Sequence, residues 1–464
     1  MKKIILISCF IAFWASAQSQ YIAEVLEYKP APGQLINESP WGVASSATSI
    51  VGGVTGTLTL GAWGGYVVFR FDEPVQNHPE NPFGVDFTIF GNTLPDWSEP
   101  GVVWVMDDEN NNGEPDDTWY QLAGSDYYFS NTKKNHEVTY TNPQQATSAN
   151  VPYTDSDGLS GYIYSNSTHT QPYYPLAENF PNIPEESYTL SGTRIFPEVD
   201  STTFMTKVYK RAFGYADNQL RGTEPWTTPD NPYTNEKENA GADGFDISWA
   251  VDANGNYVEL DEVHFIKVQN GILAHGGWLG EISTEICGAA RVIPNAAISG
   301  REKIIALRDL PSIIHRHTVQ LEALAFDRGR LMEGAQLAWN VDMDGASINQ
   351  DGLLQLTQSG TLTVTAALAS NPEISATATT TIDLGSGIAE NTALQLDVFP
   401  NPAADEINVH ATNGQLQIFN ARGQLVQSVR PGKQPIGISH LPKGLYILHL
   451  RENNAVRTAK LIKK

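Results

Sequence analysis

The sequence predicts an all-β protein in which three β domains follow one another along the chain. Short segments rich in β-branched and aromatic residues, bounded by glycine, proline or aspartate, recur throughout, as in 66–71, 85–90 and 102–106. Apolar residues at helical spacing are scarce. At 464 residues the chain is also too long for one hydrophobic core, because a domain takes about 100–200 residues.

The N-terminus has the layout of a secretory signal peptide. Two lysines precede an apolar stretch, and Ala15-Ser16-Ala17 then offers a cleavage site between small residues before Gln18. We expect residues 1–17 to be removed. The mature chain keeps one cysteine, Cys287, so it cannot form a disulfide within itself.

The largest predicted domain covers residues 18–294. Its strands alternate with long polar stretches, notably 129–160 and 215–243, which we interpret as elaborate loops. Its distinctive segments are Gly65–Phe71, Asp86–Asn92, Ser98–Gly101, Trp119–Ser125 and Gly241–Ile247. Together they resemble a family of bacterial cell-surface proteins with a jelly-roll-like β-sandwich. The resemblance implies surface binding or adhesion, and some relatives belong to systems that capture corrinoids, but it brings no catalytic signature.

Near Pro294 the composition shifts and aromatic residues become sparse. A Trp339-bearing strand, an Asp351-Gly352 turn and a final strand that begins with Gly360-Thr361 follow in that order. This order is similar to a bacterial immunoglobulin-like domain, here at residues 303–384, and the resemblance implies a spacer or stalk. Residues 385–394 are small and polar and are predicted to be a linker.

The last predicted domain covers residues 395–464. Turn signals divide it into short alternating strands, which predicts a small β module. In order it carries Val398–Pro402, Leu416–Gly423, Leu441–Tyr446 and Lys460–Lys464. These motifs resemble a type A sorting domain of the type IX secretion system, a small β-sandwich. The resemblance implies that the type IX machinery is a partner, and that the protein is secreted or attached to the outer-membrane surface.

Charge is distributed unevenly along the chain. Residues 21–394 hold 18 Lys+Arg and 48 Asp+Glu, residues 395–464 hold 9 and 4, and the whole chain carries a net charge of −23. An acidic body repels phosphate backbones and anionic lipid, so we expect no nucleic-acid partner, and calcium or a neutral ligand fits better. Apart from the signal peptide, no apolar run approaches the ~18 residues of a membrane span.

The sharpest chemical motif is D-x-N-x-N-G-x-x-D-D at residues 108–117. Its oxygen-bearing side chains could converge on one Ca²⁺, which takes about 6–8 oxygen ligands, and Gly113 permits the sharp turn. The predicted metal ligands are Asp108, Asn110, Asn112, Glu114, Asp116 and Asp117. The motif departs from an EF-hand because Trp119 stands at the twelfth position and strands flank it. The alternative is a solvated acidic turn.

Two further turns repeat the pattern more weakly. Asp252-Ala253-Asn254-Gly255-Asn256 is explained by a tight hairpin turn between two strands. Asp155-Ser156-Asp157-Gly158 is weaker still. We do not expect calcium at either turn.

Two glycine-rich turns combine aromatic and acidic residues and are candidate ligand-binding surfaces. One carries Trp97 and Glu99, and the other carries Trp278 and Glu281. An exposed tryptophan offers a sugar or a flat ring a large contact area with little entropy to lose. Both tryptophans could equally be core residues whose neighbouring glycines merely permit turning.

The sequence carries no nucleophile elbow and no H-E-x-x-H motif. Cys287 is predicted to be buried and inert. His315 and His317 are two positions apart, so in a strand they would point to the same face. We interpret them as a pair of surface histidines rather than a zinc site. A glycosidase needs two carboxylates about 5–9.5 Å apart in a cleft, and the candidates for such a pair are Glu99, Asp246, Glu281 and Glu285.

We therefore expect an exported protein whose N-terminal sandwich binds calcium and presents aromatic loops to an extracellular ligand, a glycan or a corrinoid. Two alternatives stay open. One is a carbohydrate-active hydrolase, and the other is a structural protein of the surface layer or biofilm matrix.

Overall fold

The structure, a computed structural model, describes residues 19–202, 206–223, 226–385, 396, 398–409, 414–420, 422–432, 434–452 and 455–464. The predicted signal peptide, and the predicted linker apart from Gly385, lie outside these residues. Strands dominate the described residues, and the helices among them are short 3₁₀ turns, so the all-β prediction is confirmed. No described helix is long and apolar enough to cross a membrane.

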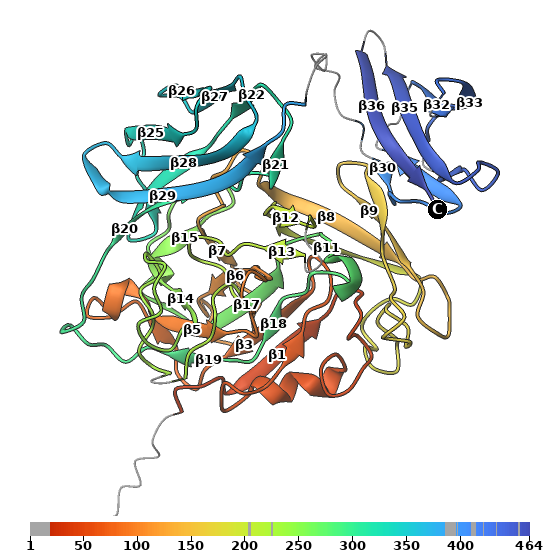
Figure 1. Ribbon diagram of the computed structural model, residues 1–464. Helices are drawn as coiled ribbons and strands as arrows, with labels where there is room; N and C mark the ends of the chain where they lie inside the picture. Colours follow the sequence, from red (N-terminus) through yellow and green to blue (C-terminus); the bar gives the residue numbers. More distant parts are fainter. Residues whose placement is uncertain are drawn as a thin grey trace, which may run out of the picture.

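A six-stranded antiparallel sheet forms the centre of the N-terminal body (Figure 1). In spatial order it consists of β1 (Glu24–Lys29), β3 (Tyr66–Arg70), β17 (Phe265–Asn270), β6 (Gly101–Met106), β7 (Tyr120–Leu122) and β15 (Ala250–Val251). A three-stranded sheet of β14 (Asp243–Phe245), β5 (Phe87–Phe90) and β19 (Gly288–Arg291) contributes to the same hydrophobic core. Phe69, Val103 and Val268 enter this core from the first sheet, and Phe87 and Ile89 enter it from the second.

A second body sheet has its own core. It is built of β10 (Ser160–Ile163), β9 (Val151–Asp155), β8 (Lys133–Thr141) and β11 (Ser187–Arg194). The prediction that 129–160 is a loop is therefore wrong, because β8 and β9 lie within it. His136, Val138 and Tyr140 are buried at every second position of β8. This alternation is a strand signal that the surrounding polar residues obscured.

Short elements complete the body. The strand pairs are β12 (Val199–Asp200) with β13 (Lys207–Val208), β4 (Val75–Gln76) with β16 (Glu262–Val263), and β2 (Leu58–Thr59) with β18 (Glu285–Ile286). The 3₁₀ helices are η1 (Ala44–Ile50), η2 (Pro82–Gly84), η3 (Ile247–Trp249) and η4 (Gly277–Leu279).

Strands β20 to β29 form three small sheets that lie together beside the body (Figure 1). The first contains β20 (Lys303–Leu307), β23 (Ala323–Asp327) and β24 (Arg330–Leu331). The second contains β21 (Ile313–Ile314), β29 (Asn371–Ile382), β28 (Gly360–Leu368) and β25 (Leu337–Asp342). The third contains β22 (Thr318–Gln320), β27 (Leu353–Leu356) and β26 (Ala346–Ile348).

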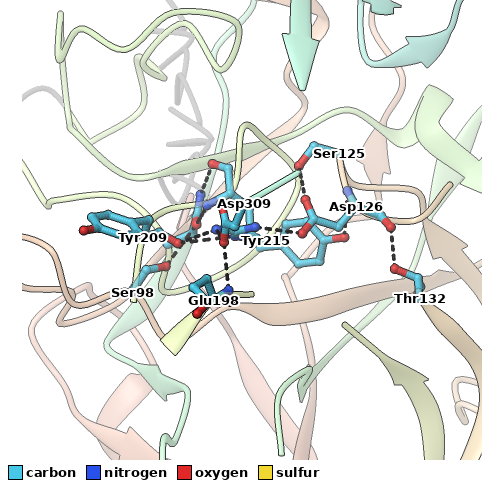
Figure 2. Close-up of polar contacts among 10 residues, drawn as sticks. Ser98, Ser125, Asp126, Thr132, Glu198, Tyr209, Tyr215 and Asp309 are labelled. Atoms are coloured by element: carbon cyan, nitrogen blue, oxygen red, sulfur yellow. Dashed lines mark hydrogen bonds and ion pairs between the residues drawn. The ribbon is translucent and has the colours of Figure 1, made fainter. Parts of the chain in front are cut away.

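This region, predicted as a spacer, packs directly against the body. Phe326 of β23 is fully buried in the main body core, where its ring centroid lies 5.0 Å from that of Phe213. Figure 2 shows the polar contacts beside this junction, which involve Asp126 of the body and Asp309. The Arg211 guanidinium joins them, donating from Nη1 to Asp126 over 3.0 Å and from Nη2 to Asp309. Such shared packing was not anticipated from the sequence.

The C-terminal residues form two further sheets around a third core. One contains β30 (Val398–Phe399), β31 (Glu406–Val409) and β34 (Ile436–Gly437), and the other contains β33 (Leu425–Val429), β32 (Gln415–Asn420), β35 (Gly444–Glu452) and β36 (Ala455–Lys463). Their buried apolar residues, such as Ile407, Leu416, Leu448 and Leu461, pack together.

Candidate functional site

The predicted calcium loop, 108–117, connects β6 to β7, and its side chains fold back onto its own backbone. The Asp108 carboxylate accepts hydrogen bonds from the Asn112 N–H over 3.0 Å and the Gly113 N–H over 2.9 Å. The Asn110 and Asn112 amides both donate to Asp116, over 3.1 Å in each closest contact. Gly113 has a φ of +78°, which favours glycine. The loop thus gathers carboxylate and amide oxygens, which are possible metal ligands. Calcium binding stays a prediction from the sequence pattern.

Two further predicted ligands, Asp117 and Glu114, are placed differently. Asp117 accepts from the Asn110 side-chain amide over 3.3 Å, so it belongs to the same group of side chains. Glu114 contributes its N–H, which donates to the Asn112 side-chain oxygen over 2.7 Å.

Arg70 attaches this loop to the six-stranded sheet. Its guanidinium donates to the Gly113 carbonyl over 3.3 Å and to the Glu24 carboxylate of β1 over 2.7 Å. A cavity of about 600 Å³ adjoins this contact and includes Asp108 and His264 in its lining. Two residues after Asp117 the chain reaches Trp119, which lies directly before β7.

The sheet register places a lysine among aromatic side chains on the face turned away from the main core. Lys267 of β17 lies opposite Trp104 of β6, and Tyr66 of β3 lies diagonally across from it. The strand neighbours of the lysine, Ile266 and Val268, are buried in the core. Because successive side chains alternate between faces, Lys267 points to the other side of the sheet.

Three aromatic rings surround the Lys267 ammonium. Its Nζ lies 4.8 Å from the ring centroids of both Trp104 and Trp119 and 5.8 Å from that of Tyr66. A cavity of about 200 Å³ adjoins it, lined on one side by Glu27 and Lys29 and on the other by Thr189, Leu190 and Ser191 of β11. We call this cavity, with Tyr66, Trp104, Trp119 and Lys267, the lysine pocket.

The electrostatics of the lysine pocket are unusual for a protein this acidic. Burial lowers the pKa of Lys267 from 10.5 to about 8, and Glu27 opposes the shift only partly. Within the described part of the chain, the ammonium has no hydrogen-bond or ion-pair partner. The Trp104 indole N–H and the Gln269 side-chain oxygen are also buried without described partners. Buried polar groups normally find partners, so these two atoms are exceptions, and both are enclosed by protein rather than open to the cavity.

Sequence reasoning missed the lysine pocket. Tyr66 and Trp104 were assigned to strands and Trp119 to the end of the loop, and nothing singled out Lys267. A polar residue in the apolar run Val263–Val268 was the available signal, but its aromatic neighbours are more than 140 positions earlier in the chain.

The predicted ligand-binding acids lie inside the body. Glu99 is 7% exposed, and its carboxylate oxygens lie within 4.8 Å of those of buried Asp217 and Glu285. Burial raises the pKa of all three, that of Asp217 to about 7, and Glu99 donates a side-chain hydrogen bond to Glu285. The group therefore holds protons that free carboxylates would have lost at neutral pH.

Glu281 lies in the same interior. It is 3% exposed, and its Oε1 accepts a hydrogen bond from the Gln34 N–H over 2.8 Å. Burial raises the pKa of Glu281 to about 7. Asp246, the last acid considered for a glycosidase pair, is 4% exposed and caps η3 by accepting from the Ser248 N–H. A glycosidase pair flanks a cleft, whereas these acids are enclosed by side chains.

Trp97, one of the two predicted ligand-binding tryptophans, is not among the residues that line the lysine pocket. Trp97 is half-buried and packs against Gly276, where an added Cβ would lie 2.2 Å from the indole. The backbone of Trp278 belongs to η4, but its side chain lies outside the described part of the structure. The structure thus brings Trp97 close to the Trp278 turn without defining a ligand surface there.

The weaker sequence candidates have ordinary structural roles. Asp252 accepts hydrogen bonds from the Asn254 and Asn256 N–H groups, which completes a tight turn. Asp155 lies 3.3 Å from the Arg194 guanidinium. His315 and His317 contact backbone carbonyls through Nδ1.

Burial of the Cys287 thiol raises its pKa to about 11, which keeps the thiol protonated at neutral pH.

Comparison with known proteins identifies the C-terminal region. Residues 397–464 match the family model described as a secretion system C-terminal sorting domain. This match supports export by the type IX system, contact with its machinery, and a location outside the cell or on its surface. The chain matches no curated protein.

Solved structures resemble the chain only distantly. PorU from Porphyromonas gingivalis, in its dimeric latent form, shares 13% identity over 72% of this chain and 30% of its own, with a TM-score of 0.13. Extracellular domains 3–5 of Drosophila OTK share 11% identity over 45% of this chain and 82% of their own, with a TM-score of 0.16. The S-layer protein rSbsC shares 10% identity over 87% of this chain and 53% of its own, also with a TM-score of 0.16. No argument rests on likenesses this small.

Proposed function

We propose that this exported protein binds an extracellular ligand in the lysine pocket. The observation that carries the proposal is the position of Lys267, whose ammonium lies among three aromatic rings and has no described hydrogen-bond acceptor. Leaving a charge desolvated and unpaired destabilises a fold. A bound ligand that accepts from this ammonium and stacks on the rings offsets that penalty.

Export and binding belong to different parts of the chain. The sorting domain at residues 397–464 directs the protein out of the cell, whereas the lysine pocket lies on the N-terminal body. A secreted or surface-attached binding protein uses both, and an adhesion role would follow if the ligand belongs to another surface.

Calcium at residues 108–117 is the second part of the proposal. It rests on the spacing of the oxygen-bearing residues and on the short connection from Asp117 to Trp119. We propose that Ca²⁺ would fix the loop and thereby hold the Trp119 indole over Lys267. The ion would then support binding without contacting the ligand.

A binding experiment on the mature full-length protein tests this function. The ligands are neutral glycans, acidic glycans and corrinoids, added with calcium present and again with a chelator, and the readouts are thermal midpoint and calorimetric titration. A specific ligand raises the midpoint in a saturable way by mass action. Trp119→Ala should abolish that shift. Tyr209→Ala removes a ring that is 40% exposed elsewhere on the body, so it should bind normally.

The opposite results are equally informative. If no ligand shifts the midpoint, or if Trp119→Ala binds as the wild type does, the lysine pocket is not the binding site. Concentration-dependent self-association without ligand binding would favour the structural matrix alternative.

A further inference from the structure

We propose that the lysine pocket recognises a sugar ring that carries a carboxylate, the chemistry of a uronic acid unit in an extracellular glycan. The inference rests on the proposed binding function and specifies its ligand class. It draws on the charge of the lining, the arrangement of the rings and the polar groups at the rim.

The lining is locally cationic. Lys29 and Lys267 both contribute to it, and Glu27 is its only acid among the described residues. That acid is already engaged, because its Oε1 accepts a hydrogen bond from the Tyr66 hydroxyl over 2.7 Å. Glu27 keeps its negative charge in this hydrogen bond, so the two lysines and one acid give the lining a net charge of +1, which an incoming carboxylate meets. Charge-assisted hydrogen bonds of this kind are about twice as strong as neutral ones.

The net charge of the protein does not prevent this recognition. Charges farther away than about 8–10 Å are largely screened at physiological ionic strength, so the groups that line the pocket dominate a ligand inside it. The acidic body does oppose a densely charged polyanion. A short oligomer of uronic acid units carries few charges and places one of its carboxylates inside the pocket, so it satisfies both conditions. The expectation of calcium or a neutral ligand was based on the net charge of the chain. The net charge does not show that the lining of this pocket is positively charged.

The rings and the size of the cavity favour one cyclic group. Tyr66 and Trp119 both line the cavity and are half-buried, so part of each ring is accessible. Aromatic faces pack well against the apolar face of a ring. The volume of about 200 Å³ is below the ~300–1,000 Å³ of clefts that enclose a whole drug-sized ligand. The pocket therefore suits a single unit of a longer chain.

Polar groups at the rim favour a sugar over an aromatic acid. Thr189 and Ser191 of β11 are exposed at the cavity, and Gln269 also belongs to its lining. Hydroxyl and amide groups can exchange hydrogen bonds with ring hydroxyls. A benzoate-like ligand would leave these groups unused.

Calorimetric titration of the mature full-length protein tests the inference with three probes. Trigalacturonate carries the proposed carboxylate, trigalactose is its neutral counterpart, and benzoate is an aromatic carboxylate without hydroxyls. We expect trigalacturonate to bind at least about tenfold more tightly than either of the others. A charge-assisted contact of about 1.4 kcal/mol corresponds to that factor.

Variants then assign the affinity to the ammonium. Lys267→Met should weaken trigalacturonate binding at least about tenfold, because it removes the charge-assisted hydrogen bond. Lys134→Met is the matched control, because Lys134 lies over the Tyr127 ring, 3.7 Å from its centroid, outside the pocket. Thermal midpoints of all variants report whether each one is folded.

The possible results distinguish a failure of the inferred ligand class from a failure of the proposed binding function. If trigalactose binds as tightly as trigalacturonate, or if Lys267→Met binds as the wild type does, the pocket does not recognise a carboxylate. The proposed binding function would still hold if binding depends on Trp119. If benzoate binds as tightly as trigalacturonate, the inference that the pocket recognises a sugar ring is wrong. If no probe binds and the wider ligand panel also fails, the proposed function itself is wrong.

Discussion

Replacing Lys267 with methionine should stabilise this protein at neutral pH. Methionine has nearly the length of the lysine side chain and fills the same space between the aromatic rings, but it carries no charge. The lysine is half-buried, its ammonium is partly desolvated, and it lacks a described hydrogen-bond acceptor. The substitution therefore removes a partly desolvated charge without opening a cavity, and the free energy of unfolding should rise.

The size of the effect follows from the titration of Lys267. Burial lowers its pKa from 10.5 to about 8, and one pKa unit corresponds to about 1.4 kcal/mol. Keeping Lys267 protonated in the folded state therefore lowers the free energy of unfolding by about 3 kcal/mol at pH 7, before other contributions are counted. Loss of cation–π attraction in the variant, about 0.5–2 kcal/mol, opposes it. We expect a net gain of about 1–3 kcal/mol in the free energy of unfolding.

The sign of the pH dependence is fixed by the direction of the shift. The folded-state pKa lies below the unfolded-state value, so the unfolded chain binds more protons between about pH 8 and 10.5. The loss of stability caused by protonated Lys267 is therefore complete below about pH 8 and disappears above about pH 10.5. Glu27, Lys29 and Tyr66, which face Lys267, are unchanged in the variant, so their titration largely cancels in the comparison.

Differential scanning calorimetry at pH 7 and at about pH 10.5 measures the effect. A gain of 1 kcal/mol raises the midpoint of a 150–250-residue domain by about 2–4 °C. Lys267→Met should therefore raise the body transition by roughly 2–12 °C at pH 7 and hardly at all at the higher pH. Exposed Lys134 again provides the control substitution. A lower midpoint at pH 7, or a difference that is the same at both values, would refute the reasoning.

Three other predictions test the rest of the structure. Calcium should raise the thermal midpoint, by about 2.7 kcal/mol in stability at one hundred times its dissociation constant; Asp108→Asn should abolish the rise and Asp252→Asn should not, and an unresponsive wild type refutes the metal. Arg211→Met leaves two carboxylates without their shared cation, so it should cost about 3–5 kcal/mol and split the calorimetric transition; a single, unshifted transition contradicts this. Burial raises the pKa of Glu281 from 4.5 to about 7, so wild-type stability falls as pH rises through that window; the midpoint of Glu281→Gln should gain on the wild type from about pH 5 to about pH 8, and a constant difference would count against it.

A binding site that lowers stability fits what is known of functional sites in general. Residues arranged for a ligand often violate the rules that stabilise a fold, and ligand-free proteins carry the cost. Lys267 is such a violation, since a solvent-exposed lysine or an apolar residue at this position would stabilise the fold more. The stability and binding experiments therefore address the same physical feature from two sides.

The sequence by itself determined the features that depend on near neighbours in the chain. Alternating strands and turn residues predicted an all-β protein, and the ordered motifs of residues 395–464 identified the sorting domain. The hydrogen bonds of the 108–117 loop are likewise local, because Asp108 and Gly113 lie five positions apart. Each of these signals is complete within one short segment.

Only the tertiary structure decided which distant residues meet. Lys267 and Trp104 become neighbours through the pairing of β17 with β6, and a slip of one residue would turn the lysine into the core. The burial of Glu99 and Glu281, likewise, depends on segments from the whole body. Register and burial arise from packing between elements far apart in the chain, so the residues themselves carry no local sign of either.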